Sequence, residues 1–419
     1  MTTIDTTAPV VDTVRPCPVC THRRAQLVHH HALRTAEHHP VGDGYDVVVC
    51  ERCGVGYADA AIRQSDYDAI YAETAKYGEA AVTEFGADAS APTDSAWNIE
   101  RLTRTADLLE ELLPGRNSRV LDVGCAGGTL LGILARRGWS DVAGLDPSAR
   151  SAATAARFHG VQVAVGTFGT VPADLGTFDC VTMTGVLEHV WDVEEAMRAA
   201  TSLVRPGGIV YVDVPDAARY CDAFAAPFQD FSTEHINHFT SPTLRTLFEA
   251  WGFEGVWEGP VMADCCGVSH PAIGAAWRLM PAAGHRPGEV KVIHHDGTLV
   301  AELTEFARRS NAVVAEIDAH LRRALDGHDE IVVWGMGELS NTLLAQTVLG
   351  DKRYAALVDG NPCRHGLRYG DVEVSAADAV ARTGAPIVVA SILSEQSIRA
   401  DIARRRFPNP VVTLLPGEL

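Results

Sequence analysis

The chain has 419 residues, more than one compact core usually holds, so we expect two or three domains. The formal charge of −19 disfavours nucleic acid as a partner, because a polyanion would be repelled at long range. Mean hydropathy is +0.02, and the sequence contains no apolar run long enough to span a membrane. The first residues lack the basic region and apolar core of a signal peptide. We therefore expect a cytoplasmic protein that does not bind membranes.

Two closely spaced cysteine pairs lie near the N-terminus. Cys17 and Cys20 form CPVC, and Cys50 and Cys53 lie in CERCG. Two residues between the thiols let a tight turn present both sulfurs to one ion, and a second turn completes a tetrahedron. We therefore predict an N-terminal zinc-binding domain over residues 1–75 with a structural Zn²⁺. Because four protein ligands leave no open position, the ion is expected to stabilise the fold and not to catalyse.

A buried strand, a glycine turn and a helix are predicted at VLDVGCAGGTLL, residues 120–131. The glycines do not have the GxGxxG spacing of a dinucleotide site, and Asp122 at the strand end would repel a pyrophosphate. That carboxylate would instead attract an ammonium or a sulfonium group. The next predicted strand ends at Asp146, where a carboxylate can accept hydrogen bonds from both ribose hydroxyls of a nucleoside. Together these features indicate a site for S-adenosyl-L-methionine.

Four segments resemble, in order, the motifs of class I methyltransferases: VLDVGCAGG, GLDPS, FDCVTMTGVLEHV and LVRPGGIVYVDVPD. The resemblance implies a Rossmann-like α/β methyltransferase domain, which we place at residues 76–260. It implies donor contacts from the glycine turn, the second strand end, the loop flanking the adenine and the end of a later strand: Asp122, Gly124, Gly127, Asp146, Pro147, Thr167, Phe168, Glu188 and His189. For the last two residues, a polar helix start is an equally good interpretation.

The segment FQDFSTEHINHFTSPTL, residues 228–244, gathers Glu234, His235 and His238 within five positions. A helix is predicted to begin at Ser241, with Pro242 at its first position. Histidine has a pKa suited to moving a proton near neutral pH, so this loop is a candidate for acid–base chemistry. The alternative is that one of the two histidines only braces the helix.

The order of segments along nearly the whole chain resembles the sugar C-methyltransferases that act on nucleotide-linked ketodeoxysugars. A tyrosine-containing stretch follows the cysteines, and a second strand–turn–helix, EIVVWGMGELSNTLL, lies in a predicted C-terminal Rossmann-like substrate domain at residues 261–419. The resemblance implies that His235 removes the proton beside the ketone, with Glu234 orienting it and His238 as a second candidate. It also implies substrate contacts from Tyr77 and Asn341.

The chain departs from that family at several positions. Ser232 and Thr233 stand where the family has Tyr and His, and Leu339 stands where it has Lys. O- or N-methylation of a sugar or related metabolite is therefore an alternative, since it asks less of a base. A zinc-ribbon RNA methyltransferase and a non-catalytic subunit are further alternatives, and the acidic charge counts against the first.

The expected substrate is a small molecule, a nucleotide sugar that is most simply dTDP-linked, used in making specialised metabolites such as antibiotics. We expect a monomer or homodimer. Gly335, Gly337 and Asp359 in the second strand–turn–helix leave open a contact with the substrate diphosphate or no ligand at all.

Overall fold

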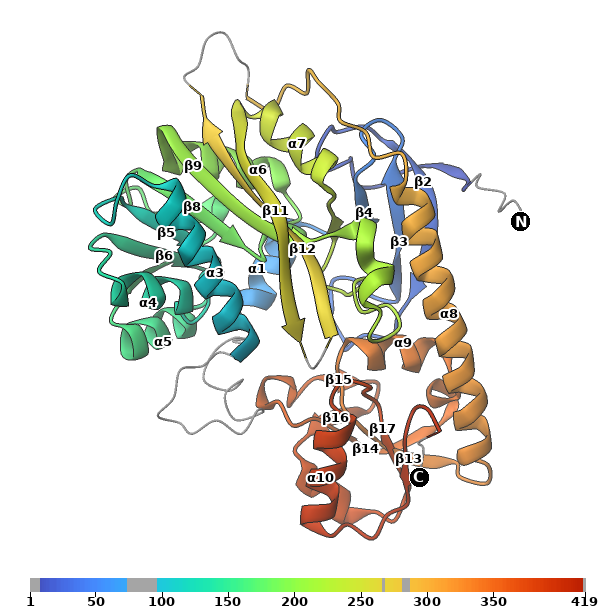
Figure 1. Ribbon diagram of the computed structural model, residues 1–419. Helices are drawn as coiled ribbons and strands as arrows, with labels where there is room; N and C mark the ends of the chain where they lie inside the picture. The colour runs from blue at the N-terminus through green and yellow to red at the C-terminus, as the bar shows by residue number, and fades with distance from the viewer. Residues whose placement is uncertain (1–7, 74–95, 266–267, 281–286, 417–419) are drawn as a thin grey trace. The chain divides into compact units, whose positions relative to one another are not determined.

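The computed structural model describes residues 8–73, 96–265, 268–280 and 287–416, and the chain forms two compact units (Figure 1). Unit 1 consists of Met1–Leu27, Val48–Ala223 and Glu234–Val300. Unit 2 consists of Val28–Val47, Phe224–Thr233 and Ala301–Leu419. The three domains predicted with boundaries after residues 75 and 260 stay a prediction.

Unit 1 is built around a seven-stranded sheet in the order β11-β12-β9-β8-β5-β6-β7. Five neighbouring strands are parallel, and β12 is antiparallel to both β9 and β11. The short central strands are apolar and buried, as expected of a parallel sheet that is covered on both faces. The strands are β5 (Val120–Val123), β6 (Val142–Asp146), β7 (Gln162–Val165), β8 (Phe178–Thr184), β9 (Val204–Pro215), β11 (Phe253–Cys265) and β12 (Val268–Leu279).

The helices of unit 1 alternate with these strands, as a parallel sheet requires. Two of them begin at side-chain caps: Ser148 accepts a hydrogen bond from the amide of Ser151, and Asp192 accepts one from the amide of Glu195. The helices are α1 (Gln64–Glu73), α3 (Ala96–Leu112), α4 (Thr129–Arg136), α5 (Ala149–His159), α6 (Val193–Leu203) and α7 (Ser241–Ala250). Together with the sheet they form the α/β core that the sequence predicts.

A smaller sheet contains the N-terminal strands in the order β1-β2-β3-β4-β10. Its strands are β1 (Val10–Asp12), β2 (Arg24–Ala32), β3 (Gly44–Cys50), β4 (Gly56–Asp59) and β10 (Asn237–His238). The two-residue strand β10 pairs antiparallel with β4, although about 180 residues separate them in the sequence: Asn237 lies opposite Tyr57, and His238 lies opposite Gly56. The loop that carries His235 therefore leads directly into a strand beside the cysteine-bearing segment.

Unit 2 contains a second α/β sheet, in the order β15-β16-β14-β13-β17-β18. All neighbouring strands are parallel except β15 and β16. The strands are β13 (Glu330–Trp334), β14 (Arg353–Val358), β15 (Arg368–Tyr369), β16 (Val372–Ser375), β17 (Ile387–Val389) and β18 (Val411–Val412). This is an α/β arrangement, and its assignment as a Rossmann-like substrate domain stays a prediction.

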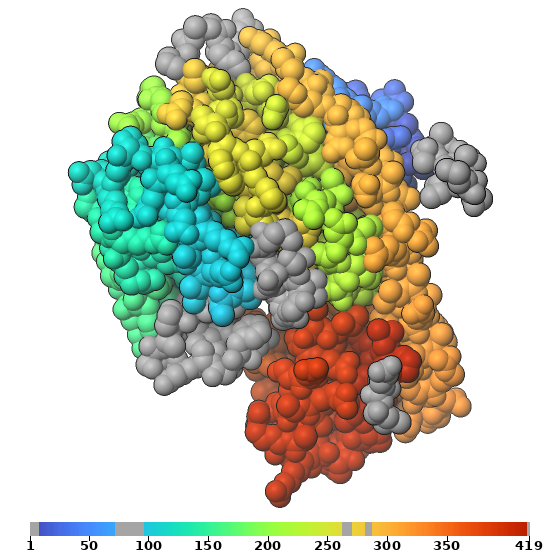
Figure 2. Space-filling view, viewed as in Figure 1, coloured from blue at the N-terminus to red at the C-terminus, as the bar shows by residue number. Residues whose placement is uncertain are grey.

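Three helices accompany this sheet: α8 (Leu299–Ala324), α9 (Glu338–Gln346) and α10 (Glu395–Arg405). The long helix α8 is amphipathic, with Leu303, Phe306 and Ile317 buried on one side. Its exposed side forms part of the face seen in Figure 2. Among the described residues, no helix is both long enough and apolar enough to cross a membrane.

Candidate functional site

The turn between β5 and α4 requires glycine at Gly124. Its φ is +69°, a left-handed conformation that other residues rarely adopt. A Cβ at this position would lie 2.7 Å from Cγ2 of Val186. The amide of Gly124 donates to the carbonyl of Leu145 at the end of β6, 2.8 Å away. Gly127 is buried in the same turn, so the turn brings the ends of two neighbouring strands together in front of the helix.

Two carboxyl groups stand at these strand ends. Asp122 is buried, and the hydroxyl of Thr182 donates to its Oδ1 at 2.6 Å. Burial raises the pKa of Asp122 to about 7. Asp146 is also buried, and its two oxygens accept from the amides of Ala126 and Ser148, each at 2.9 Å. Burial raises the pKa of Asp146 as well, while these hydrogen bonds oppose the rise.

Three further ionisable side chains lie at this edge: Asp213 and Arg101, which sequence reasoning missed, and Glu188, which it assigned to the donor. Arg101 of α3 donates to Asp213 at the end of β9, 2.6 Å away. Glu188 follows β8 and is 4% exposed. Burial raises its pKa to about 8, and it raises the pKa of Asp213 against the opposing charge of Arg101. The carboxyl groups outnumber the guanidinium of Arg101 among these side chains, and their ionised forms attract a cationic ligand.

The loop after β7 lies at the same edge of the sheet. The amide of Gly166 donates to the carbonyl of Asp146. Thr167 and Thr170 cap the short helix η1 (Phe168–Thr170) by reciprocal bonds between side chain and backbone. Phe168 is half-buried. Pro147 follows Asp146 directly and is half-buried too. The predicted donor-binding residues thus share one edge of the sheet, and their contacts with a donor stay a prediction.

A group of acid–base side chains lies next to this edge. His189 ends the short helix η2 (Leu187–His189), and its ring centroid is 4.8 Å from that of His235. The Nε2 atom of His189 is 3.9 Å from Oε1 of Glu188. Its Nδ1 atom is 3.1 Å from the hydroxyl of Tyr71 and 3.1 Å from the carbonyl oxygen of Glu234. Sequence reasoning gave His189 to the donor and His235 to catalysis, and the structure places the two side by side.

The side chains of Glu188, His189 and His235 can also hold a metal ion. One donor atom from each lies within 4.8 Å of the others. Two imidazoles and a carboxylate suit divalent transition metals, and an imidazole whose other nitrogen donates to a carbonyl is typical of a metal ligand. This arrangement therefore permits either proton transfer or metal binding.

Three other predicted residues have different surroundings. His238 is fully buried, its Nδ1 lies 3.1 Å from the hydroxyl of Tyr220, and burial lowers its pKa to about 3. Its burial favours a bracing role over catalysis. Asn341 lies in α9 of unit 2, is 7% exposed and accepts a hydrogen bond from the hydroxyl of Tyr369. Tyr77 lies outside the described residues.

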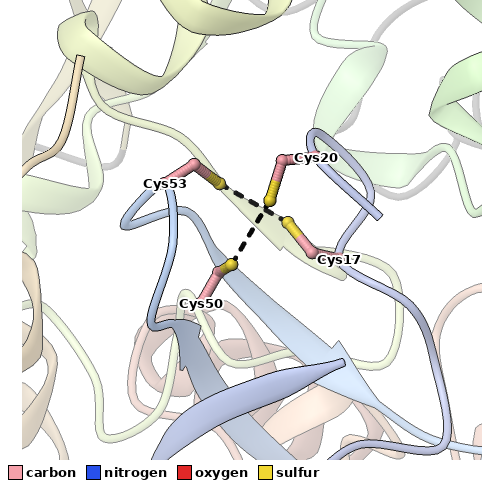
Figure 3. A group of neighbouring side chains, drawn as sticks. All are labelled: Cys17, Cys20, Cys50 and Cys53. Atoms are coloured by element: carbon pink, nitrogen blue, oxygen red, sulfur yellow. Dashed lines mark hydrogen bonds between the residues drawn. The ribbon is translucent and has the colours of Figure 1, made fainter. Parts of the chain in front are cut away.

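The four cysteines of the N-terminal pairs are buried and converge (Figure 3). The Sγ atoms of Cys17 and Cys53 are 3.5 Å apart, as are those of Cys20 and Cys50. A tetrahedral zinc site with Zn–S bonds near 2.3 Å places its sulfurs about 3.8 Å apart, so the cluster fits this ion. Burial raises the pKa of Cys17 well above its usual range, and bonds within the cluster lower that of Cys50. A bound cation would favour the thiolate form of all four.

Comparisons with known proteins agree with this geometry. The family model described as a methyltransferase domain matches residues 97–258. A ubiquinone biosynthesis O-methyltransferase from Rhizobium johnstonii is 43% identical over 194 residues, which cover 43% of this chain and 73% of that protein. One from Bordetella avium is 42% identical over 106 residues, covering 24% of this chain and 42% of its own. A protein from Mycolicibacterium smegmatis, named a probable S-adenosylmethionine-dependent methyltransferase, is 31% identical over 157 residues, covering 36% and 56%.

Solved structures are similar to this chain at lower sequence identity. A SAM-dependent methyltransferase from Methanosarcina mazei is 20% identical, with a TM-score of 0.36, and the match covers 42% of this chain and 98% of that one. The [4+2]-cyclase SpnF is 18% identical, also with a TM-score of 0.36, covering 43% and 81%.

Proposed function

Because the chain belongs to the S-adenosylmethionine-dependent methyltransferases, we propose that it methylates a carbon atom beside the ketone of a nucleotide-linked deoxysugar. The order of motifs along the chain supports this acceptor, and so does the pair of histidines beside the donor edge. The donor, when bound, supplies an electrophilic methyl group. The four N-terminal cysteines hold a structural Zn²⁺ in the same proposal.

The observation that carries the proposal is the contact between His189 and His235, whose ring centroids are 4.8 Å apart. A carbon atom becomes nucleophilic only after it loses a proton, so C-methylation needs a base at the acceptor. Imidazole accepts a proton near neutral pH. Two imidazoles at this edge therefore supply a base and a second group that can receive or return the proton.

We assign the base to His235 and a supporting role to its neighbours. The supporting histidine is His189, whose Nδ1 faces the carbonyl oxygen of Glu234. Because a carbonyl oxygen only accepts hydrogen bonds, Nδ1 of His189 carries the proton and its Nε2 is the basic nitrogen. Glu188 lies on the Nε2 side. Because Nδ1 of His189 carries the proton, the hydroxyl oxygen of Tyr71 accepts from this ring, and its own O–H is the group that can donate to an acceptor. It can stabilise the oxyanion of an enolate. The loop that carries His235 supplies no tyrosine for this role, because Ser232 and Thr233 stand where the resembled family has Tyr and His.

O-methylation is the second candidate, because two relatives similar in sequence are named ubiquinone biosynthesis O-methyltransferases. Removing a proton from a hydroxyl asks less of the base than removing one from carbon. The same histidine pair serves both reactions, and a phenol gives up its hydroxyl proton more easily than a sugar does. A phenolic acceptor therefore belongs in the test beside the sugars.

The test incubates the enzyme, S-adenosylmethionine and a panel of dTDP-4-ketosugars and catechols in deuterium oxide, followed by accurate-mass fragmentation. A new methyl group on a ring carbon of a sugar, lost in His235→Ala and kept in the exposed control His328→Ala, is the expected result. A methyl group on oxygen would replace the first proposal by the second. Deuterium uptake beside the ketone without methylation would mean that the base works on a sugar that is not the native one.

A further inference from the structure

Arg15 is an unusual residue for its position, because it is a cation that is 3% exposed and stands two residues before Cys17. Its backbone amide donates to Oδ1 of Asp59 at 2.7 Å. Its guanidinium lies 4.0 Å from the ring centroid of Trp191. The hydrogen bonds of the guanidinium all go to backbone carbonyl oxygens: Trp191 at 2.7 Å, Ile236 at 3.2 Å, and Ala58 and Val190 at 3.5 Å.

These carbonyls belong to the two loops that carry the site histidines. Val190 and Trp191 follow His189, and Ile236 follows His235. The two nitrogens divide between the loops: Nη1 bonds Ile236, and Nη2 bonds Trp191. The planar guanidinium therefore spans both loops with a fixed geometry, which a single ammonium group cannot do.

Other hydrogen bonds close the same arrangement. The amide of Ile236 donates to the carbonyl of Glu188 at 2.8 Å, and the carbonyl of Ile236 also accepts from the amide of Ala58 in β4. The side-chain amide of Asn237 donates to the carbonyls of Leu187 and Val190, at 2.8 and 2.7 Å. The segments around residues 58, 188–191 and 235–237 thus form one network, to which Arg15 contributes a charged donor.

Burying the guanidinium of Arg15 is unfavourable by itself, because removing a charge from water costs several kcal/mol unless its partners replace the lost hydration. A fold that needed only apolar packing at this point would be served better by a hydrophobic side chain of similar volume. The carbonyl partners hold the guanidinium through directional bonds, and each bond fixes one loop.

We propose that Arg15 is a positioning residue for methyl transfer, which sets the distance between His189 and His235 by holding both of their loops against the cysteine-bearing segment. This inference rests on the proposed acid–base role of the two histidines. The role of the N-terminal segment then goes beyond stabilising the fold, because it places the groups that move the proton.

The test compares Arg15→Met and Arg15→Lys with Arg24→Met, an exposed control on β2. Arg15→Met should lower kcat about 100-fold, because small misplacements of reacting groups cost about that much. The dissociation constant of S-adenosylmethionine, measured by calorimetry, should change less than about twofold, and zinc content should stay the same. Arg15→Lys should have a kcat between those of Arg15→Met and the wild type. It restores the positive charge but not the planar guanidinium whose two nitrogens bond both loops.

A second readout does not depend on knowing the acceptor. The imidazole NMR resonances of His189 and His235, assigned through His189→Gln and His235→Gln, should shift or broaden in Arg15→Met and stay in place in Arg24→Met. Added methylguanidine should move them back in Arg15→Ala. This readout separates a failure of the inference from a failure of the proposed function, which would appear as no turnover of any substrate by the wild type.

Two results would overturn the inference. In one, both resonances and kcat stay unchanged in Arg15→Met. In the other, Arg15→Met and Arg15→Lys lose donor affinity, zinc and transfer together and methylguanidine restores nothing, which would make Arg15 a general determinant of the fold.

Discussion

The two units contain the same local structure, a strand, a glycine turn, a helix and a second strand followed by aspartate, but they surround it with different charges. In unit 1 the first strand ends near Asp122 and the second ends at Asp146. In unit 2 the first strand ends at Trp334, and Asp359 follows the second. The ends of the two strands therefore carry two carboxyl groups in unit 1 and one in unit 2.

The two turns share a hydrogen bond from a turn amide to the aspartate of the second strand, although their helix N-caps differ: Gly128 is left-handed and Gly337 is extended. The amide of Ala126 donates to Asp146 at 2.9 Å, and that of Met336 donates to Asp359 at 2.7 Å. The difference is Arg364, whose guanidinium also donates to Asp359, at 3.1 Å. The second aspartate is thus neutralised by its own chain, and the first is left to meet a ligand. The shared hydrogen bond does not imply a shared ligand, because the surrounding charges decide what binds.

The largest effect should come from exchanging the two aspartates for asparagine. Asp146→Asn should weaken binding of S-adenosylmethionine roughly 100-fold, because charge-assisted hydrogen bonds to the ribose hydroxyls are lost. Asp359→Asn should change it less than about twofold. Calorimetric titration of both variants checks this. Equal losses would mean that the comparison between the turns is mistaken.

Excess Zn²⁺ should inhibit transfer about tenfold or more, because it competes with protons for the donor atoms of Glu188, His189 and His235. Among the described residues, both groups that bring three or more potential metal ligands together lie in unit 1. Absorption spectra with Co²⁺ in place of Zn²⁺ distinguish the two groups. Four thiolate ligands give intense charge-transfer bands, and the carboxylate and two imidazoles give a weaker set. His235→Gln should abolish the weaker set of bands and keep the thiolate set.

Donor affinity should rise with pH between pH 6 and 7.5. Burial raises the pKa of Asp122 to about 7, so its carboxyl group is mostly protonated at the lower pH and mostly ionised at the upper one. A cationic donor binds the ionised form more tightly, which predicts a rise of roughly five- to tenfold. Asp122→Asn should flatten the curve, and Asp359→Asn should leave it as in the wild type. A curve that falls with pH would contradict the assignment.

The smallest effect on donor binding should come from Arg364→Ala, with less than about a twofold change. The variant leaves the buried carboxyl group of Asp359 without its cation, which should destabilise unit 2 by about 1–2 kcal/mol. The guanidinium of Arg364 is partly exposed in the wild type, so solvent screens this ion pair and keeps the loss of stability small. Hydrogen exchange of α9 measures the change, and adding Asp359→Asn should restore protection. Tighter donor binding would mean that unit 2 takes part in the first site.

Local sequence was enough to predict the donor edge. Gly124, Asp122 and Asp146 lie within about 25 positions of one another, and each is required by a strand–turn–helix whose apolar pattern is visible in the sequence. The pairing of cysteines at CxxC spacing was equally local. The methyltransferase core was therefore predictable, and the matches to known methyltransferases confirm it.

Other contacts had no local signal. In the sequence, Arg101 is one of several polar residues of an amphipathic helix and has no distinguishing feature. Its contact with Asp213 forms because the helix packs near the end of β9. The pairing of β10 with β4 joins distant residues through two short strands, which no periodicity reveals.

By itself, the sequence determined the class of donor, the strand-end acids Asp122 and Asp146, and the four candidate metal ligands, because these depend on side chains set by neighbours in the chain. Only the tertiary structure decided which groups act together. It placed His189 beside His235, buried His238 against Tyr220, and bonded the loops that carry His189 and His235 to the guanidinium of Arg15. The physical reason is that burial and hydrogen bonding depend on what the folded chain brings near, and both change the pKa and the freedom of a side chain whose identity stays the same.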